Sequence, residues 1–187
     1  MKNFTLKLLI TTFAFVSLPS YAVDATNRFN TVGKFGNWEV IEFSFPGKLL
    51  YRISAMAIKN ERENITFDLT NDNCEPAPAI LVTQLTQYIP ELDHSRMPYA
   101  YKIPGQAPVR ELVTTEIAKG DKYAFIGFNG LTVAKLLKPS SKGRLSLWVP
   151  VSSEITDNAG DKNNAYFALD GIQDAYKSAV QFCKANK

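Results

Sequence analysis

Side chains that could do chemistry are few in this chain, which has a single histidine, His94. One histidine excludes a zinc site built from several histidines, and any Ser-His-Asp triad would depend on His94. Its neighbour Ser95 lacks the strand-turn-helix frame of a nucleophile elbow. We therefore expect His94 to be an exposed loop residue, and we identify no catalytic residue.

Carboxylates that could act in pairs are scattered along the chain. Asp68 and Asp72 lie close in sequence, and so do Asp157 and Asp161. Either pair could help to bind calcium, but neither fits the calcium-binding loop with its terminal glutamate. The phosphate-binding motif GxxxxGK[ST] does not occur. We expect turn chemistry at these positions and predict neither a metal nor a cofactor.

The two cysteines, Cys74 and Cys183, are more than a hundred residues apart, and no CxxC motif is present. In an exported protein, such a pair more often forms a disulfide than a redox site. We therefore predict a disulfide between Cys74 and Cys183, which would also consume the usual thiol nucleophile. Closing a loop of about 100 residues stabilises a fold by up to ~4.7 kcal/mol in the chain-entropy model.

Tyrosines and prolines gather between Gln87 and Pro108. Because frequent prolines cannot donate to a central ladder, this segment is predicted to be a loop or an irregular edge. A long loop in a compact domain is often functional, and tyrosines can bury a large area on a partner. The candidate binding residues in this segment are Tyr88, Met97, Tyr99, Tyr101 and Ile103.

A different interpretation of this segment stays open. Tyr99 and Tyr101 could instead cover the edge of the sheet and serve stability. If the segment serves neither recognition nor packing, the binding face must be sought on the sheet around Arg144, Ser146 and Trp148.

The first 22 residues have the pattern of a signal peptide. A positive start at Lys2 and Lys7 precedes an apolar run from Leu8 to Leu18, and a small-x-small pattern ends at Ala22. The apolar run is too short to span a bilayer comfortably. We expect export to the periplasm, or alternatively secretion, with no stable membrane insertion after cleavage.

Residues 23–187 are expected to form a single β-rich domain. Two of the 21 basic residues of the chain lie in the signal peptide, so the remainder nearly balances the 18 acidic residues. This balance lacks the basic excess of a nucleic-acid binder, and we predict no nucleic-acid partner.

A helix at the end of the chain is the most strongly marked element. Asp170 and Gln173 have the spacing of a capping box, which predicts a helix from Gly171 to Lys184. Its apolar residues form one stripe with helical spacing. They are Ile172, Ala175, Tyr176, Ala179, Val180 and Cys183. The stripe predicts that the helix packs on a core, with the disulfide tying it to the body of the domain.

Alternating apolar residues predict strands over most of the remaining chain. The expected strands are residues 37–45, 49–58, 65–69, 80–85, 109–117, 123–128, 144–151 and 166–169. Pro46 and Gly47 indicate a hairpin turn, and the charged run Lys59 to Asn64 indicates a solvated loop. Asn129-Gly130 fits either a hairpin turn or the start of a short helix, and we favour the helix.

These elements predict a mainly β fold. We expect an antiparallel β-sandwich or a curved sheet, with a C-terminal helix docked by a disulfide.

Two patterns near the ends of the domain carry a family resemblance. A Gly-x-Trp-x-Val strand spans Gly36 to Val40, and a Phe-x-Leu-x-Gly-x-x-x-Ala run spans Phe167 to Ala175 ahead of Cys183. The layout resembles the invasion-associated locus B family of small exported bacterial proteins and, more loosely, periplasmic accessory proteins of type VI secretion. The segment from Gln87 to Pro108 has no counterpart in this resemblance. The chain also lacks the further cysteine pair expected in many members of the first family.

The resemblance implies a β-rich exported domain that acts in envelope or host contact, which would associate it with virulence. It carries over no catalytic residue. We predict a non-enzymatic periplasmic or secreted protein that binds another protein or an envelope component. One alternative is a cell-wall or glycan hydrolase that uses paired carboxylates. Another is a carrier of an apolar ligand, which requires an internal cavity. The oligomeric state is left open.

Overall fold

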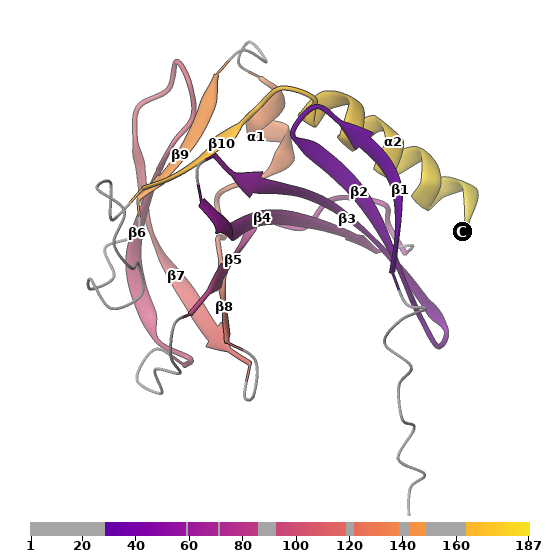
Figure 1. The fold of residues 1–187 in the computed structure, drawn as a ribbon, viewed down its shortest axis with the longest axis horizontal. Coiled ribbons are helices and arrows are strands. Elements are labelled where there is room, and N and C mark those ends of the chain that lie inside the picture. The colour runs from indigo at the N-terminus through magenta and orange to yellow at the C-terminus, as the bar shows by residue number, and fades with distance from the viewer. Residues whose placement is uncertain are drawn as a thin grey trace, which may run out of the picture.

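The computed structural model describes residues 29–58, 60–70, 72–85, 93–118, 122–138, 143–148 and 164–187, which contain ten strands and two helices (Figure 1). The predicted signal peptide lies outside these residues. The strands are β1 (Phe29–Phe35), β2 (Trp38–Phe45), β3 (Lys48–Ala57), β4 (Asn60–Thr70), β5 (Ile80–Gln84), β6 (Arg96–Lys102), β7 (Val109–Ile117), β8 (Tyr123–Gly127), β9 (Arg144–Trp148) and β10 (Asn164–Ala168). The helices are α1 (Val133–Leu137) and α2 (Ile172–Ala185).

The ten strands of the described residues belong to one antiparallel sheet in the order β1-β2-β3-β4-β5-β8-β7-β6-β9-β10. The first five strands follow chain order. The chain then crosses to β6 and returns through β7 to β8, which pairs with β5. After α1, strands β9 and β10 extend the sheet beyond β6. The predicted mainly β antiparallel fold with a C-terminal helix is confirmed.

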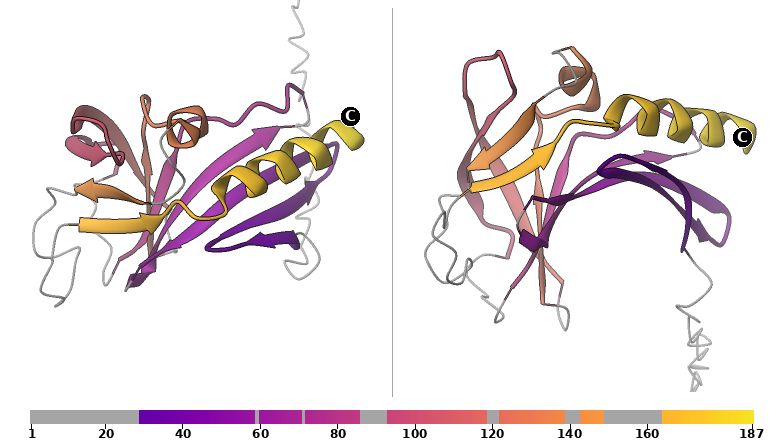
Figure 2. Two further views of the ribbon diagram at one scale, coloured as in Figure 1. Left: turned by 90° about the horizontal axis from the view of Figure 1, so that it is seen from above. Right: turned by 45° about the horizontal axis from the view of Figure 1, so that its top comes forward.

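The sheet is strongly curved, as Figures 1 and 2 show. Strands β6, β9 and β10 stand at one end of the bend, whereas α2 lies across β1 to β4 at the other end. The backbone amide of Ile58, just after β3, donates to the carbonyl oxygen of Tyr166 in β10 over 2.7 Å. This bond joins strands far apart in the sheet order. The inward strand faces are apolar and buried, as at Ile53, Phe67 and Leu147, so they form one continuous core.

Helix α2 docks through the stripe that the sequence predicts. Ile172, Ala175, Ala179 and Cys183 are buried, and Tyr176 and Val180 pack beside them. The predicted disulfide is confirmed, because Cys183 is bonded to Cys74, with 5.6 Å between their Cα atoms. The helix is therefore held both by packing and by a covalent bond.

Polar contacts hold both ends of the α2 region. The indole nitrogen of Trp38 donates to the carbonyl oxygen of Ala168 over 2.8 Å, ahead of the helix. Beyond it, the Asn186 amide donates to the Tyr51 hydroxyl, which donates to Glu42. Burial, reinforced by the Glu42 carboxylate, raises the pKa of Tyr51 to about 12. Tyr51 therefore stays neutral as a link between the helix end and the sheet.

The capping box predicted at Asp170 is wrong. The residue before the first turn of α2 is Gly171, with a φ of +86°, and no side-chain cap is present. A Cβ atom at this position would lie 1.9 Å from the carbonyl oxygen of Phe35 in β1. Close packing of the helix start on the end of β1 therefore requires a glycine with a left-handed backbone. Tertiary contact, not local capping, sets where the helix begins.

The loop predicted from Lys59 to Asn64 is wrong from Asn60 to Asn64, and Lys59 lies outside the described residues. Strand β4 starts at Asn60 and pairs with β3 on one side and with β5 on the other. Arg62 is exposed and its neighbour Glu63 is buried, so these successive charged residues alternate between the two faces as the side chains of a strand do. Pairing on both sides outweighs the local preference of charged residues for a solvated turn.

The loop or irregular edge predicted from Gln87 to Pro108 is corrected in its central part. Arg96–Lys102 is strand β6, which lies inside the sheet between β7 and β9. The described part of β9 pairs only with Ala100, Tyr101 and Lys102. Among the described residues, Pro98 therefore pairs with β7 alone, a position that tolerates a missing N–H group.

Several smaller boundaries also differ from the prediction. β1 is a strand that the sequence does not predict, because this edge strand is mostly exposed and lacks an apolar alternation. The predicted hairpin at Pro46-Gly47 is confirmed, with a φ of +73° at Gly47. The helix favoured after Asn129-Gly130 is confirmed as α1, whose N-cap residue is Thr132. The predicted strand 144–151 is described only as far as Trp148.

Candidate functional site

The predicted binding residues that the structure describes between Gln87 and Pro108 lie in or against the core and do not form an exposed surface. Tyr99, Tyr101 and Ile103 are each 1% exposed, and Met97 is half-buried against the core. Tyr88 lies outside the described residues. With their side chains enclosed, Tyr99, Tyr101 and Ile103 have no area left to offer a partner. The alternative, in which the two tyrosines serve stability, agrees with these positions.

Tyr99 and Tyr101 share one packing partner. Both rings meet Phe128 edge-on, with centroids 5.7 Å and 6.2 Å from its ring. Such edge-to-face contacts stabilise a core beyond the area that they bury. Burial, together with the Glu63 carboxylate, raises the pKa of Tyr99. Tyr99 is therefore a neutral core residue.

Two hydrogen bonds join α1 and the segment before it to the sheet. Lys135 in α1 donates to the hydroxyl of Tyr101 over 3.4 Å, and the backbone amide of Gly130 donates to Glu111 over 2.9 Å. These bonds hold the segment before α1 against β6 and β7. The residue types could take part in acid-base chemistry, but each contact here positions an element of the fold.

The predicted acidic pairs are not brought into a metal site. Asp68 accepts two hydrogen bonds from Arg52, at 2.6 Å and 2.8 Å, in a bidentate ion pair between β3 and β4. Asp72 is an exposed turn residue, and Asp157 and Asp161 lie outside the described residues. The residues that the structure describes contain no group of three or more potential metal ligands.

Two carboxylates do share a hollow with the single histidine. Asp93, His94 and Glu116 line a depression of about 410 Å³ at one end of β7. His94 is exposed, as predicted, and has a φ of +57°. Asp93 accepts a hydrogen bond from the amide of Ile117 over 2.9 Å. The Asp93 carboxylate therefore already has a structural contact, since it binds the amide at the end of β7.

A second hollow lies on the outer side of the sheet, across β2, β3, β4, β5 and β8. It has a volume of about 270 Å³ and a mixed polar and apolar lining that includes Phe43, Met56 and Tyr123. The guanidinium of Arg52 lies 5.0 Å from the centre of the Phe43 ring. Because this hollow is open and lies outside the core, it is not the internal cavity that a carrier of an apolar ligand requires.

Basic and apolar side chains gather on the outer face of β6, β7 and β9, which we call the basic face. Side chains alternate along each strand, and the strand pairing brings Pro98 beside Leu112 and Ala100 beside both Arg110 and Trp148. The face presents four exposed cations and two exposed large apolar side chains. They are Arg96, Lys102, Arg110 and Arg144, with Leu112 at 59% and Trp148 at 42% exposure.

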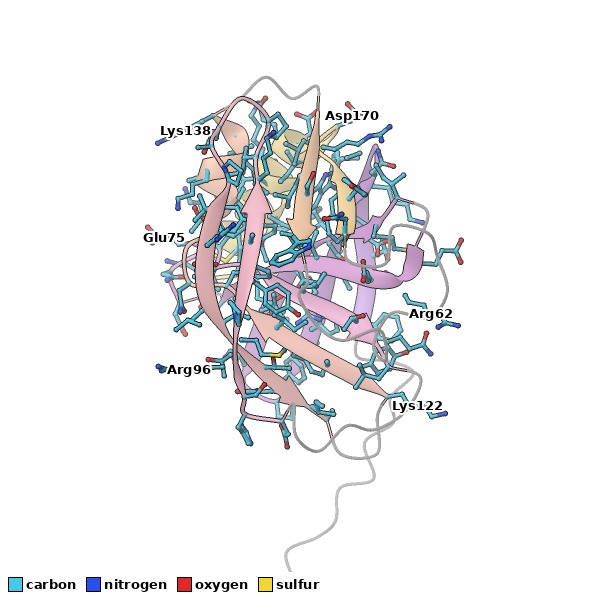
Figure 3. The ribbon with its side chains drawn as sticks, turned by 90° about the vertical axis from the view of Figure 1, so that its left-hand side faces the viewer. Arg62, Glu75, Arg96, Lys122, Lys138 and Asp170 are labelled. Carbon is cyan, nitrogen blue, oxygen red and sulfur yellow. A yellow bond between two sulfur atoms is a disulfide. The ribbon has the colours of Figure 1, made fainter. Side chains whose placement is uncertain are left out.

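The charges of the basic face find no acidic partner among the residues that the structure describes. In the described part of the chain, none of its four cations forms an ion pair or a side-chain hydrogen bond. Glu116, near the end of β7, is the one carboxylate at the outward positions of β6, β7 and β9. Figure 3 views this side of the molecule and shows Arg96 projecting away from it. The face can therefore attract an acidic partner from solution.

Sequence reasoning found only part of this face. Arg144, Ser146 and Trp148 were proposed as a fallback, and they do lie together on the outside of β9. Arg96 was missed because its segment was expected to be a loop. The alternation of Arg96, Pro98, Ala100 and Lys102 was the available signal, but it becomes a surface only through pairing with β7 and β9.

Comparison with known proteins adds no family assignment, since no protein-family model, curated protein or solved structure matches the chain. The resemblance to the invasion-associated locus B family therefore stays a prediction. Among the described residues, no helix is long and apolar enough to cross a membrane. The disulfide is typical of a protein that folds in an oxidising compartment.

Proposed function

We propose that this protein is a non-enzymatic binding or accessory protein of the cell envelope, located in the periplasm or secreted. The observation that supports the proposal is the basic face, where four exposed cations that form no ion pair with another described residue lie around the exposed side chains of Leu112 and Trp148. The disulfide and the signal-peptide pattern of residues 1–22 support export.

The chemistry of the face favours binding over catalysis. Exposed aromatic and arginine side chains are the types that contribute most to binding energy at interfaces. Clustered cations that have no acidic partner among the described residues repel one another, and this repulsion costs stability. An acidic protein or envelope component that covers the face would supply the missing charge and bury Leu112 and Trp148.

Envelope association tests this function. Arg96→Glu together with Arg110→Glu reverses the face, and the double variant should be lost from the envelope pellet that retains the parent protein. Lys177→Glu together with Lys184→Glu makes the same change in net charge at exposed positions of α2. This control should sediment like the parent protein, and both variants should melt like it. Equal retention of the two variants would contradict the proposal.

The hydrolase alternative has one specific observation in its favour, the hollow that Asp93 and Glu116 share. A glycosidase needs one carboxyl group as an acid and a second as a base or nucleophile. If the alternative holds, Asp93→Asn and Glu116→Gln should each abolish the release of fragments from purified cell wall. Absence of release by the parent protein would remove the alternative.

A further inference from the structure

We propose that the basic face docks on the surface of an anionic phospholipid bilayer. This inference rests on the proposed function and names its partner: an envelope component with phosphate headgroups above a hydrocarbon layer. The protein would lie on the membrane surface without spanning it.

The arrangement of the face matches the two layers of a bilayer surface. Neighbouring strands lie about 4.8 Å apart, so Arg110 and Trp148, on either side of Ala100, are separated by roughly 10 Å across the face. Leu112 follows Arg110 along β7, and Arg96 lies toward the Thr114 end of the same strand pair. Lys102 and Arg144 lie toward the opposite end. The apolar side chains thus lie among the cations, with Arg96 toward one end, Arg110 level with Trp148, and Lys102 and Arg144 toward the other end.

Each residue type has a place at a lipid surface. Arginine binds phosphate through paired N–H donors, and a row of cations is attracted by the negative potential of an anionic leaflet. Tryptophan favours the headgroup level, where its ring meets hydrocarbon and its N–H group meets water. An acidic polysaccharide would use the cations but would leave Leu112 exposed. A bilayer uses both kinds of side chain.

The shape of the molecule also favours a surface over a chain-like ligand. Strands β6, β7 and β9 belong to the end of the curved sheet that lies away from α2, and the basic face is the outer face of this end (Figure 1). The basic face is therefore accessible to a bilayer along all three strands. The hollow across β2 to β5 and β8 lies elsewhere on the sheet, so no groove on the basic face is needed for the contact.

Vesicle binding can be read through the protein's own fluorescence, because the sequence has two tryptophans in different settings. Trp38 is buried and hydrogen-bonded, whereas Trp148 is 42% exposed on the basic face. Vesicles of phosphatidylglycerol and phosphatidylethanolamine should shift the emission to the blue, and brominated lipid should quench it. Vesicles of phosphatidylcholine alone should do neither. Trp148→Phe should remove the response and leave the emission of Trp38.

Charge reversal then identifies the contact. Arg96→Glu with Arg110→Glu changes the face by four charge units, and at about fivefold per charge it should lower partitioning by on the order of a hundredfold or more. Lys177→Glu with Lys184→Glu should partition like the parent protein apart from a small long-range effect. High salt should weaken binding of the parent protein, because it shortens the range of the attraction.

Leu112→Ser provides a variant that leaves the charge unchanged. Since Leu112 is 59% exposed, the change should lower vesicle partitioning about tenfold without lowering the melting temperature. Failure of the parent protein to bind anionic vesicles would overturn the lipid inference. So would binding without a change in Trp148 emission, or equal binding by the two charge-reversed pairs.

The outcome separates this inference from the proposed function. If anionic vesicles are not bound but envelope sedimentation still depends on Arg96 and Arg110, the face is a binding site and the lipid is the wrong partner. An acidic protein or polysaccharide would then be the ligand. If neither assay depends on these arginines, both proposals are wrong.

Discussion

At the scale of single residues, the fold depends on places where the backbone comes close to itself. Gly171 is the clearest, since it both adopts a φ of +86° and packs against the carbonyl group of Phe35. Several tyrosine side chains are also enclosed by the fold. Tyr51, Tyr99 and Tyr101 carry polar groups, yet all three are buried in the core. Residue type alone therefore does not distinguish residues that could bind a partner from residues that pack in the core of this protein.

Replacing Gly171 by alanine should destabilise the protein strongly. The new Cβ atom would fall 1.9 Å from the Phe35 carbonyl oxygen, so the start of α2 would have to move away from β1. Gly47→Ala is the matched control, because Gly47 has a similar φ of +73° and open space around it. We expect a loss of about 1 kcal/mol for the control and roughly 3 to 5 kcal/mol for Gly171→Ala. Urea unfolding measures both, and equal losses would show that backbone strain alone accounts for the effect.

At the scale of elements, the sequence predicts those strands and helices in which the spacing of apolar residues shows which face is buried. Most of the expected strands alternate, and the apolar stripe of α2 is uninterrupted, so both are recognised locally. β4 begins inside a charged run, and β6 contains Pro98. Both are strands because a neighbour far away in the sequence pairs with them. The basic face depends on the same long-range register, which explains why only its β9 part could be predicted.

The disulfide is expected to strengthen the docking of α2 without being essential to it. Cys74→Ser with Cys183→Ser removes a link between residues 109 positions apart. The stability should fall by about 2 to 4 kcal/mol, since long closed loops restrict the unfolded chain most. The helix should remain docked, because Ile172, Ala175 and Ala179 are still buried. Near- and far-ultraviolet circular dichroism during urea unfolding would test this, and loss of α2 in the absence of urea would contradict it.

At the scale of the whole molecule, one curved sheet serves two separate tasks. The half from β1 to β4 is covered by α2 and carries the disulfide-linked part of the core (Figure 2). The half from β6 to β9 leaves its outer side exposed and basic. Binding at the second half would thus leave the helix-covered half undisturbed, so the fold can present a charged surface on a stable base.

This division predicts an uneven pattern of amide hydrogen exchange. β3 and β4 are paired on both sides and contact α2, so their amides should open only with global unfolding. β1 is an edge strand with a register shift between Thr31 and Gly33, and it should exchange first, with an opening free energy several kcal/mol lower. Exchange measured by mass spectrometry should also show β6, β7 and β9 slowing when anionic vesicles are added, whereas β1 stays unchanged. Protection of β1 equal to that of β3 would mean that the edge is covered, for example by a second copy of the chain.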